Sequence, residues 1–150
     1  MSVTERSRPC LRTSARYRSA VAERGLAGSV TLTGRVDYAE AGRHLALGEV
    51  AVSPKRSATE ANGKLLNYMA CGLPTIAYDG PVARENLGDA GVFVPLGDRT
   101  ALATALAGLL ADAGERKRRG EALRERAVAE FGWPALAERL VETYRASGRD

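Results

Sequence analysis

The chain alternates short apolar runs with stripes of apolar residues at helical spacing. Near the start, Val21 and Leu26 are spaced as on a helix, and the spacing then shortens to every second residue in "SVTLTG". Apolar residues every third or fourth position indicate a helix, whereas alternation among β-branched residues indicates a strand. We therefore expect a helix over about residues 13–24 that leads into a strand at 29–33.

Three further strand-like runs follow, each separated from the next by a helical segment. "DYAEAGRHLALG" starts at a capping residue, Asp37, and "EVAVSP" is a short strand that ends at Pro54. A helix is expected over Gly63–Ala70, because Gly72 is a typical helix terminator and Pro74 prevents resumption. "PTIAYD" and "AGVFVP" are the next strands, with the short helix "PVARENLG" between them.

The last third of the chain has only the helical period. A leucine stripe starts at Leu102, a charged helix is expected over about residues 114–130, and a final helix starts at Pro134. Strands that alternate with helices predict an α/β fold with a parallel sheet covered by helices on both faces. Ligands of such sheets bind at the carboxyl ends of the strands, which directs attention to loops at about 34–37, 53–63 and 79–84.

Length and composition narrow the class of protein. A chain of 150 residues with 45% hydrophobic content is long enough for one domain with a core. It has no apolar run of 18 residues and no apolar stretch near its start that would act as a secretory signal, so we expect a cytoplasmic protein without a transmembrane segment.

The net charge of +4 comes from the N-terminal segment, because six arginines and two glutamates fall within residues 1–24. No aromatic-rich or recognised reader motif accompanies these charges, so no nucleic-acid partner is expected. Cys10 and Cys71 lack metal-ligand spacing and His44 is the single histidine, so the sequence predicts no metal site and reduced thiols. His44 is expected on a helix surface.

The stretch "ATEANGKLLNYMACGLPTIAYD" holds the candidate chemistry. The first N–H groups of a helix have no partner within it and carry the positive end of its dipole, so they suit a phosphate. Gly63 would let a phosphate approach, Lys64 adds a cation, and Glu60 could accept hydrogen bonds from sugar hydroxyls. Asn62 is either a ligand contact or simply the helix cap, in which case Lys64 only faces solvent. Asp79 and Gly80 end the next strand and form either a turn or a contact.

From about residue 15 to 146 the chain resembles the C-terminal, nucleotide-sugar-binding portion of family-4 GT-B glycosyltransferases, the glycosyl transferases of group 1. The resemblance rests on "VTLTGRVDYAEAGRHLALGEVAVSP", "EANGKLLNYMACGLPTIAYDGPVARENLGDAGVFVPLGD" and "FGWPALAERLVETYR". It implies a partial Rossmann-like parallel sheet of about four strands, with helices on both faces and C-terminal helices. Residues 15–150 would be a partial GT-B C-terminal domain, preceded by a disordered or unselected segment, residues 1–14.

The resemblance also implies roles for individual residues. Glu60 corresponds to the catalytic acid that faces the donor sugar, one place short of the family's Glu-x7-Glu spacing. The position of the second acid is occupied by Asn67. Asparagine can still hydrogen-bond to a ribose hydroxyl, but it is neutral, so the contact lacks the charge of a glutamate. Two groups of residues are implied in binding the donor: Asn62, Gly63, Lys64 and Leu65 at the diphosphate, and Gly34, Arg35 and Val36 at the edge of the base pocket.

The function implied is transfer of a sugar, with retention, from a nucleotide-diphosphate-sugar donor to an acceptor hydroxyl, without a further cofactor. This chain would be N-terminally truncated and would supply part of the donor-binding half, so the isolated chain is expected to be inactive. The central strands of the family's sheet are missing; the strand at 29–33 must then pair directly with the strand at 49–53 or leave free edges. The alternatives are a non-catalytic nucleotide-binding module, a module that pairs with a second chain supplying the acceptor half, or an inactive gene remnant.

Overall fold

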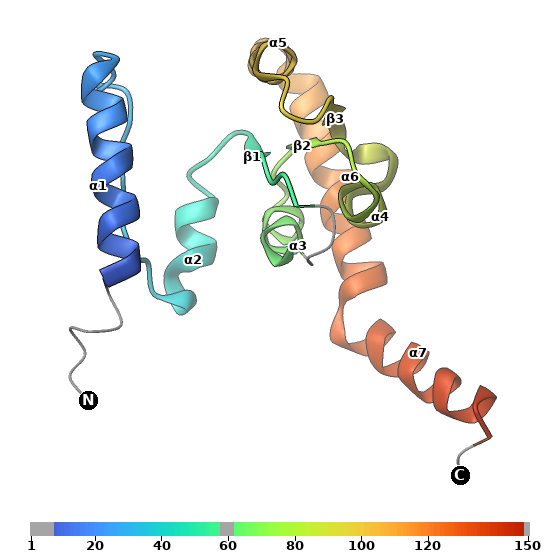
Figure 1. Ribbon diagram of the computed structural model, residues 1–150. Coiled ribbons are helices and arrows are strands. Elements are labelled where there is room, and N and C mark those ends of the chain that lie inside the picture. The colour runs from blue at the N-terminus through green and yellow to red at the C-terminus, as the bar shows by residue number, and fades with distance from the viewer. Residues whose placement is uncertain (1–7, 58–61, 149–150) are drawn as a thin grey trace. The chain divides into compact units, whose positions relative to one another are not determined.

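The computed structural model describes residues 8–57 and 62–148, and Figure 1 shows their helices and strands. The chain divides into two compact units, one up to Ala41 and one from Gly42 onward, and each is described by itself.

The first unit is helical, with no strand among its described residues. Helix α1 spans Arg8–Glu23 and so begins before the expected start at about 13. Helix α2 spans Tyr38–Leu45, so that it begins in the first unit and ends in the second. It is capped as expected, because Asp37 Oδ1 accepts a hydrogen bond of 3.1 Å from the N–H of Ala39. His44 is exposed on α2, as expected.

The strand expected at 29–33 is not formed, and this prediction was wrong. Val30 and Leu32 remain 37% and 41% exposed in an irregular segment, and no strand of the described chain pairs with it. A strand exists only when its backbone groups pair with those of a neighbour, so β-branched alternation alone does not create one. The direct pairing with the strand near residue 50, one of the two outcomes considered above, is also absent from the single sheet.

The second unit is built on a parallel sheet of three strands in the order β1-β2-β3. Strand β1 spans Ala51–Ser53, β2 spans Thr75–Tyr78 and β3 spans Val92–Val94. Val52 is paired with Ile76, and Ile76 with Val92. The α/β fold and the parallel sheet are thus confirmed, with three strands in the described residues instead of about four.

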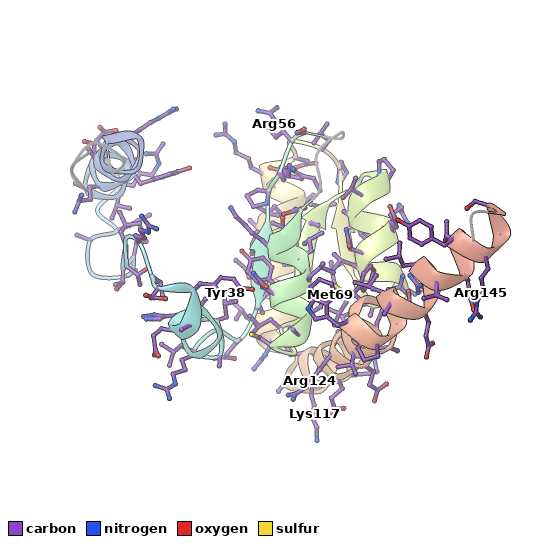
Figure 2. The ribbon with its side chains drawn as sticks, turned by 90° about the horizontal axis from the view of Figure 1, so that it is seen from below. Tyr38, Arg56, Met69, Lys117, Arg124 and Arg145 are labelled. Atoms are coloured by element: carbon purple, nitrogen blue, oxygen red, sulfur yellow. The ribbon has the colours of Figure 1, made fainter. Side chains whose placement is uncertain are left out.

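Helices cover both faces of this sheet, as expected. Helices α3 (Gly63–Ala70), α4 (Pro81–Leu87) and α6 (Ala113–Phe131) pack against the face that carries Ala77 and Phe93. Helix α5 (Arg99–Ala111) packs against Ile76, Tyr78 and Val94 on the other face. The two sets alternate along the strands because successive strand residues point to opposite faces. Figure 2 shows Met69 of α3 among the helices, and Met69 is fully buried.

A backbone contact fixes α6 beneath the end of α3. Helix α3 ends at Ala70 and Gly72 follows its cap residue with a φ of +68°, while the N–H of Leu73 donates to the carbonyl of Tyr68 at 3.0 Å. This is the glycine-terminated helix end that Gly72 predicted. A Cβ on Gly120 would lie 2.1 Å from the carbonyl oxygen of Gly72, so only glycine allows α6 to approach this closely.

Arginines of α6 hold the neighbouring elements by hydrogen-bonding to their backbone carbonyls. Arg119 donates to the carbonyls of Ala90 and Gly91 at 3.0 and 3.1 Å, in and just after the 3-10 turn η2 (Gly88–Ala90). Its guanidinium also pairs with Glu115, at 2.6 Å. Hydrogen bonds from Arg118 and Arg119 lower the pKa of the Glu115 carboxyl below its usual value.

The last helix, α7, spans Trp133–Ala146 and has no buried residue. Its exposed large apolar side chains are Trp133, Leu136, Leu140, Val141 and Tyr144. No helix in the described part of the chain is long and apolar enough to cross a membrane.

Candidate functional site

The candidate site lies where β1 and β2 end and α3 and α4 begin. The carboxyl ends of the two parallel strands meet at the same edge of the sheet, which places Ser53 and Asp79 close to the start of α3. Asn62, Gly63 and Lys64 therefore come together at this edge. Glu60 lies outside the described residues, and its proposed role as a sugar-facing acid remains a prediction.

Asn62 stands at the cap position of α3 but does not cap it with its side chain. No side-chain cap hydrogen bond is made, and Asn62 Nδ2 instead donates to Ser53 Oγ at 2.8 Å. The backbone carbonyl of Asn62 accepts from the N–H of Leu65 at 2.9 Å. The N–H groups of Gly63 and Lys64 come earlier in the helix, where no partner within the helix exists.

Two grooves flank Asn62, and both contain cationic side chains. The first is lined by Ser53, Lys55, Arg56, Ser57, Asn62, Ala77–Ala83 and Leu96. The second, of about 390 Å³, is lined by Val52–Lys55, Asn62–Lys64 and Tyr68. Lys55 is shared by both, Arg56 belongs to the first and Lys64 to the second. Positive charge beside an open helix start favours an anionic ligand.

Arg56 lies over the turn that follows β3. A Cβ on Gly97 would come within 3.1 Å of Arg56 Nη2, and Gly97 has a φ of +80°. Glycine suits this position for two reasons: it adopts the positive φ without strain, and its missing side chain leaves room for the guanidinium. Figure 2 shows Arg56 at the opposite side of the view from Lys117 and Arg124, which belong to α6.

The carboxylate at this edge, Asp79, is engaged by an arginine. Arg84 Nε and Nη2 donate to Asp79 Oδ1 and Oδ2 at 2.6 and 2.7 Å, and its guanidinium lies 4.7 Å from the centre of the Phe93 ring. The hydrogen bonds from Arg84 lower the pKa of Asp79, and those to Asp79 raise the pKa of Arg84. The pair offsets the negative charge of Asp79 beside the groove.

A third groove, of about 320 Å³, runs between α3 and α4. It is lined by Asn62, Gly63, Leu66, Val82, Glu85 and Asn86. Asn62 therefore borders all three grooves, and Gly63 borders the second and third. The start of α3 is the point at which these grooves meet.

The other residues singled out from the sequence lie elsewhere. Leu65 is fully buried in the core, and its N–H is taken by Asn62. Asn67 is exposed on α3, one turn beyond Gly63. Gly34, Arg35 and Val36 belong to the first unit, where Gly34 has a φ of +71°. Their roles in base and ribose binding remain predictions.

Sequence reasoning did not single out Ser53, Arg56 or Leu96 as site residues. Ser53 and Arg56 fall inside the 53–63 loop that the carboxyl-end argument pointed to, so their position was a usable signal. Leu96 follows a different strand, and only the assembled sheet brings it to the first groove. Within the described ranges, 8–57 and 62–148, no group of three or more His, Cys, Asp or Glu side chains could hold a metal ion.

The fold is α/β, with the start of α3 at the carboxyl edge of a parallel sheet, and comparison with known proteins gives the family. Residues 8–112 match the family described as glycosyl transferases group 1. The chain belongs to this family. Over 129 residues it is 32% identical to a phosphatidyl-myo-inositol mannosyltransferase of Mycobacterium leprae, which covers 80% of this chain and 32% of that protein.

Solved structures agree with this assignment. A sucrose-phosphate synthase from Thermosynechococcus elongatus matches with a TM-score of 0.79 and 30% identity, over 88% of this chain and 33% of that one. HepE of Anabaena, solved in complex with UDP, matches with a TM-score of 0.78 and 17% identity, over 89% of this chain and 36% of that one. A Rickettsia africae glycosyltransferase matches with a TM-score of 0.82 and 16% identity, over 96% of this chain and 38% of that one. The last two show the fold alone. The chain spans about a third of the length of these relatives.

Proposed function

We propose that this chain forms part of the donor-binding half of a group 1 glycosyltransferase and binds the diphosphate of a nucleotide sugar at the start of α3. The observation that carries the proposal is the diverted side chain of Asn62. The Asn62 side chain makes no cap bond and its Nδ2 donates to Ser53 instead, so within the described residues the first N–H groups of α3 have no side-chain cap. Phosphate oxygens accept hydrogen bonds from such groups.

The cations around this edge support the same ligand. Lys64 is exposed and lines the second groove together with Gly63. A Cβ on Gly63 would meet nothing within 4 Å, so the backbone at this point is open to a ligand. In this proposal Lys64 and the N–H groups of α3 stabilise the negative charge that develops on the leaving diphosphate.

The complete reaction is part of the proposal: transfer of a sugar, with retention, from the nucleotide sugar to an acceptor hydroxyl. Glu60 is assigned to the donor sugar, and Asn67 to a ribose hydroxyl. The relatives are about three times as long as the match, and the proposal assigns the acceptor side of the reaction to protein outside these 150 residues. Alone, the chain is expected to bind donor without transferring sugar.

A second candidate is a module that binds nucleotide but does not catalyse, or that pairs with a partner chain. The specific observation behind it is Asn67, which replaces a charged contact by a neutral one. The exposed apolar side chains of α7 are a second feature that a partner could cover. This candidate shares the diphosphate site and differs only in having no sugar transfer when an acceptor half is added.

The test is a calorimetric titration of the purified chain with UDP and with GDP, together with thermal melts. A ligand that binds the folded state raises the melting temperature. Lys64→Ala is expected to weaken binding about tenfold, since a charge-assisted contact contributes roughly 1.5 kcal/mol. Lys117→Ala removes an exposed lysine on α6 (76% exposed side chain) and is the matched control, with no expected change.

Each outcome has a definite meaning. Binding that depends on Lys64 and not on Lys117 supports the diphosphate site. A cooperative melt without any response to either nucleotide would contradict it.

A further inference from the structure

The α4 wall of the third groove is rich in hydrogen-bond acceptors. Glu85 is exposed, and within the described ranges its carboxylate makes no hydrogen bond or ion pair. Asn86 Nδ2 donates to the carbonyl of Val82 at 2.7 Å, which leaves its Oδ1 as an acceptor. The Nδ2 group of Asn62 is likewise engaged, because it donates to Ser53. A ligand that contacts this wall must therefore bring donors.

Arg126 of α6 fixes this wall from behind. Its Nη2 donates to the carbonyl of Glu85 and its Nε to that of Asn86, both at 2.8 Å. The same guanidinium pairs with Glu130 at 2.5 Å and lies 5.9 Å from the centre of the Phe131 ring. Arg126 is thus held by its own partners, and it anchors the last turn of α4. The Glu85 carboxylate is presented to the groove from a fixed backbone.

We propose that Glu85 binds a pair of adjacent hydroxyl groups of the nucleotide sugar whose diphosphate lies at the start of α3. This inference rests on the function proposed above. Gly63 borders both the second and the third groove, so a ligand with its phosphate on α3 places its neighbouring ring in reach of α4. The two oxygens of a carboxylate can accept from two vicinal hydroxyls, and its charge disfavours a phosphate in the same place.

The family resemblance adds a reason to look for a carboxylate here. Asn67 occupies the position where the family resemblance implies the second acid, and it directly follows Leu66, which lines the third groove. Glu85 approaches this groove from α4. In this proposal Glu85 supplies, from the α4 side of the groove, the negative charge that the neutral Asn67 does not.

The vicinal hydroxyls can belong to the ribose or to the transferred sugar, and the experiment separates the two. Dissociation constants are measured by calorimetry for UDP, 2′-deoxy-UDP and UDP-glucose, and for GDP, 2′-deoxy-GDP and GDP-mannose, with wild type and Glu85→Gln. Glutamine keeps the size and removes the charge. If ribose is bound, Glu85→Gln weakens UDP or GDP about tenfold and weakens the 2′-deoxy form, which keeps one of the two hydroxyls, clearly less. If the sugar is bound, only the nucleotide sugar is weakened, by a similar factor.

Glu125→Gln is the matched control, because Glu125 is an exposed glutamate on α6 that borders none of the three grooves. It should change none of these constants. If Glu85→Gln alters all ligands equally, or none, while Lys64→Ala still weakens binding, the role of Glu85 is overturned and the diphosphate site stands. If wild type binds no nucleotide at all, both proposals fall.

Discussion

The starts of α5 and α6 are closed, in the sense that a side chain accepts from an N–H of the first turn, whereas the start of α3 is open, with no side-chain cap among the described residues. Asp98 Oδ1 accepts from the N–H of Ala101 at 2.9 Å, and Asp112 Oδ1 accepts from that of Glu115 at 2.9 Å. At α3 the residue in the cap position is Asn62, an equally good cap by type, yet its side chain bonds to Ser53. A cap of this kind uses the N–H groups that an anion would otherwise bind.

The difference lies in the hydrogen bond that each cap residue makes. Helices α5 and α6 each carry an aspartate three residues before the N–H that it accepts from, and neither aspartate borders the grooves around Asn62. Helix α3 begins at the carboxyl edge of β1, within reach of Ser53. One hydrogen bond to the strand replaces the cap and keeps the helix start available for ligand.

The largest effect is expected from two glycine substitutions that separate packing from binding. Gly120→Ala should cost about 3 kcal/mol in the free energy of unfolding, because a Cβ there meets the Gly72 carbonyl oxygen at 2.1 Å and overpacked backbone cannot easily yield. Gly63→Ala should cost almost nothing, since its Cβ meets no atom within 4 Å. Urea denaturation measures both; equal costs would contradict this assignment of tight and open backbone.

The second largest effect is expected from a negative charge placed at the open start of α3, which should weaken nucleotide binding. Asn62→Asp puts a carboxylate where the phosphate is proposed, so affinity for UDP or GDP should fall at least about tenfold, while the dipole interaction leaves stability equal or slightly higher. Asn67→Asp adds the same charge one turn along α3 and should have a smaller effect. Calorimetry measures the affinities, and unchanged binding by Asn62→Asp would argue against the phosphate position.

The closed starts should respond in the opposite sense. Asp98→Ala and Asp112→Ala each remove a side-chain cap and should lower the free energy of unfolding by about 1 kcal/mol. Nucleotide affinity should not change, because neither residue borders the grooves around Asn62. Urea denaturation and titration of the same two variants provide the comparison. A loss of affinity in either would show that the two kinds of helix start are not independent.

The smallest effect is expected on the pH dependence of stability in acid. The pKa of Glu115 is lowered by hydrogen bonds from Arg118 and Arg119, so its ionised form is favoured in the folded state. That contribution is present above the unfolded pKa and is lost as pH falls through the lowered folded pKa. Glu115→Gln should therefore lose less stability than wild type between about pH 6 and about pH 3. Parallel pH profiles of the free energy of unfolding would contradict this.

Local signals predicted helix ends and caps well and strand pairing poorly. Helix α3 has the bounds that its glycine and proline stop signals indicated, and Asp37 caps α2 as expected. The strand at 29–33 failed because pairing depends on a neighbour that the segment itself does not encode. The number of strands follows from such long-range contacts, whereas the α/β class follows from the alternation alone.

The candidate site also has features that local sequence signals predicted and features that depend on long-range packing. The sequence pointed to Asn62, Gly63 and Lys64 because helix starts have local signatures, and the structure brings them together. It left open whether Asn62 caps the helix, and the answer depends on Ser53, nine residues earlier on a strand. The pairing of Arg84 with Asp79 and the placement of Glu85 opposite Gly63 likewise depend on how α4 packs, which no local pattern specifies.

The most direct test of the central claim is to follow backbone amide resonances by NMR while UDP or GDP is added to the labelled chain. The amides of Gly63 and Lys64 should shift with saturation, while those of Ala101 and Glu115, which donate to Asp98 and Asp112, should stay in place. Shifts at α5 or α6 without shifts at Gly63 and Lys64 would contradict an anion site at the open start of α3.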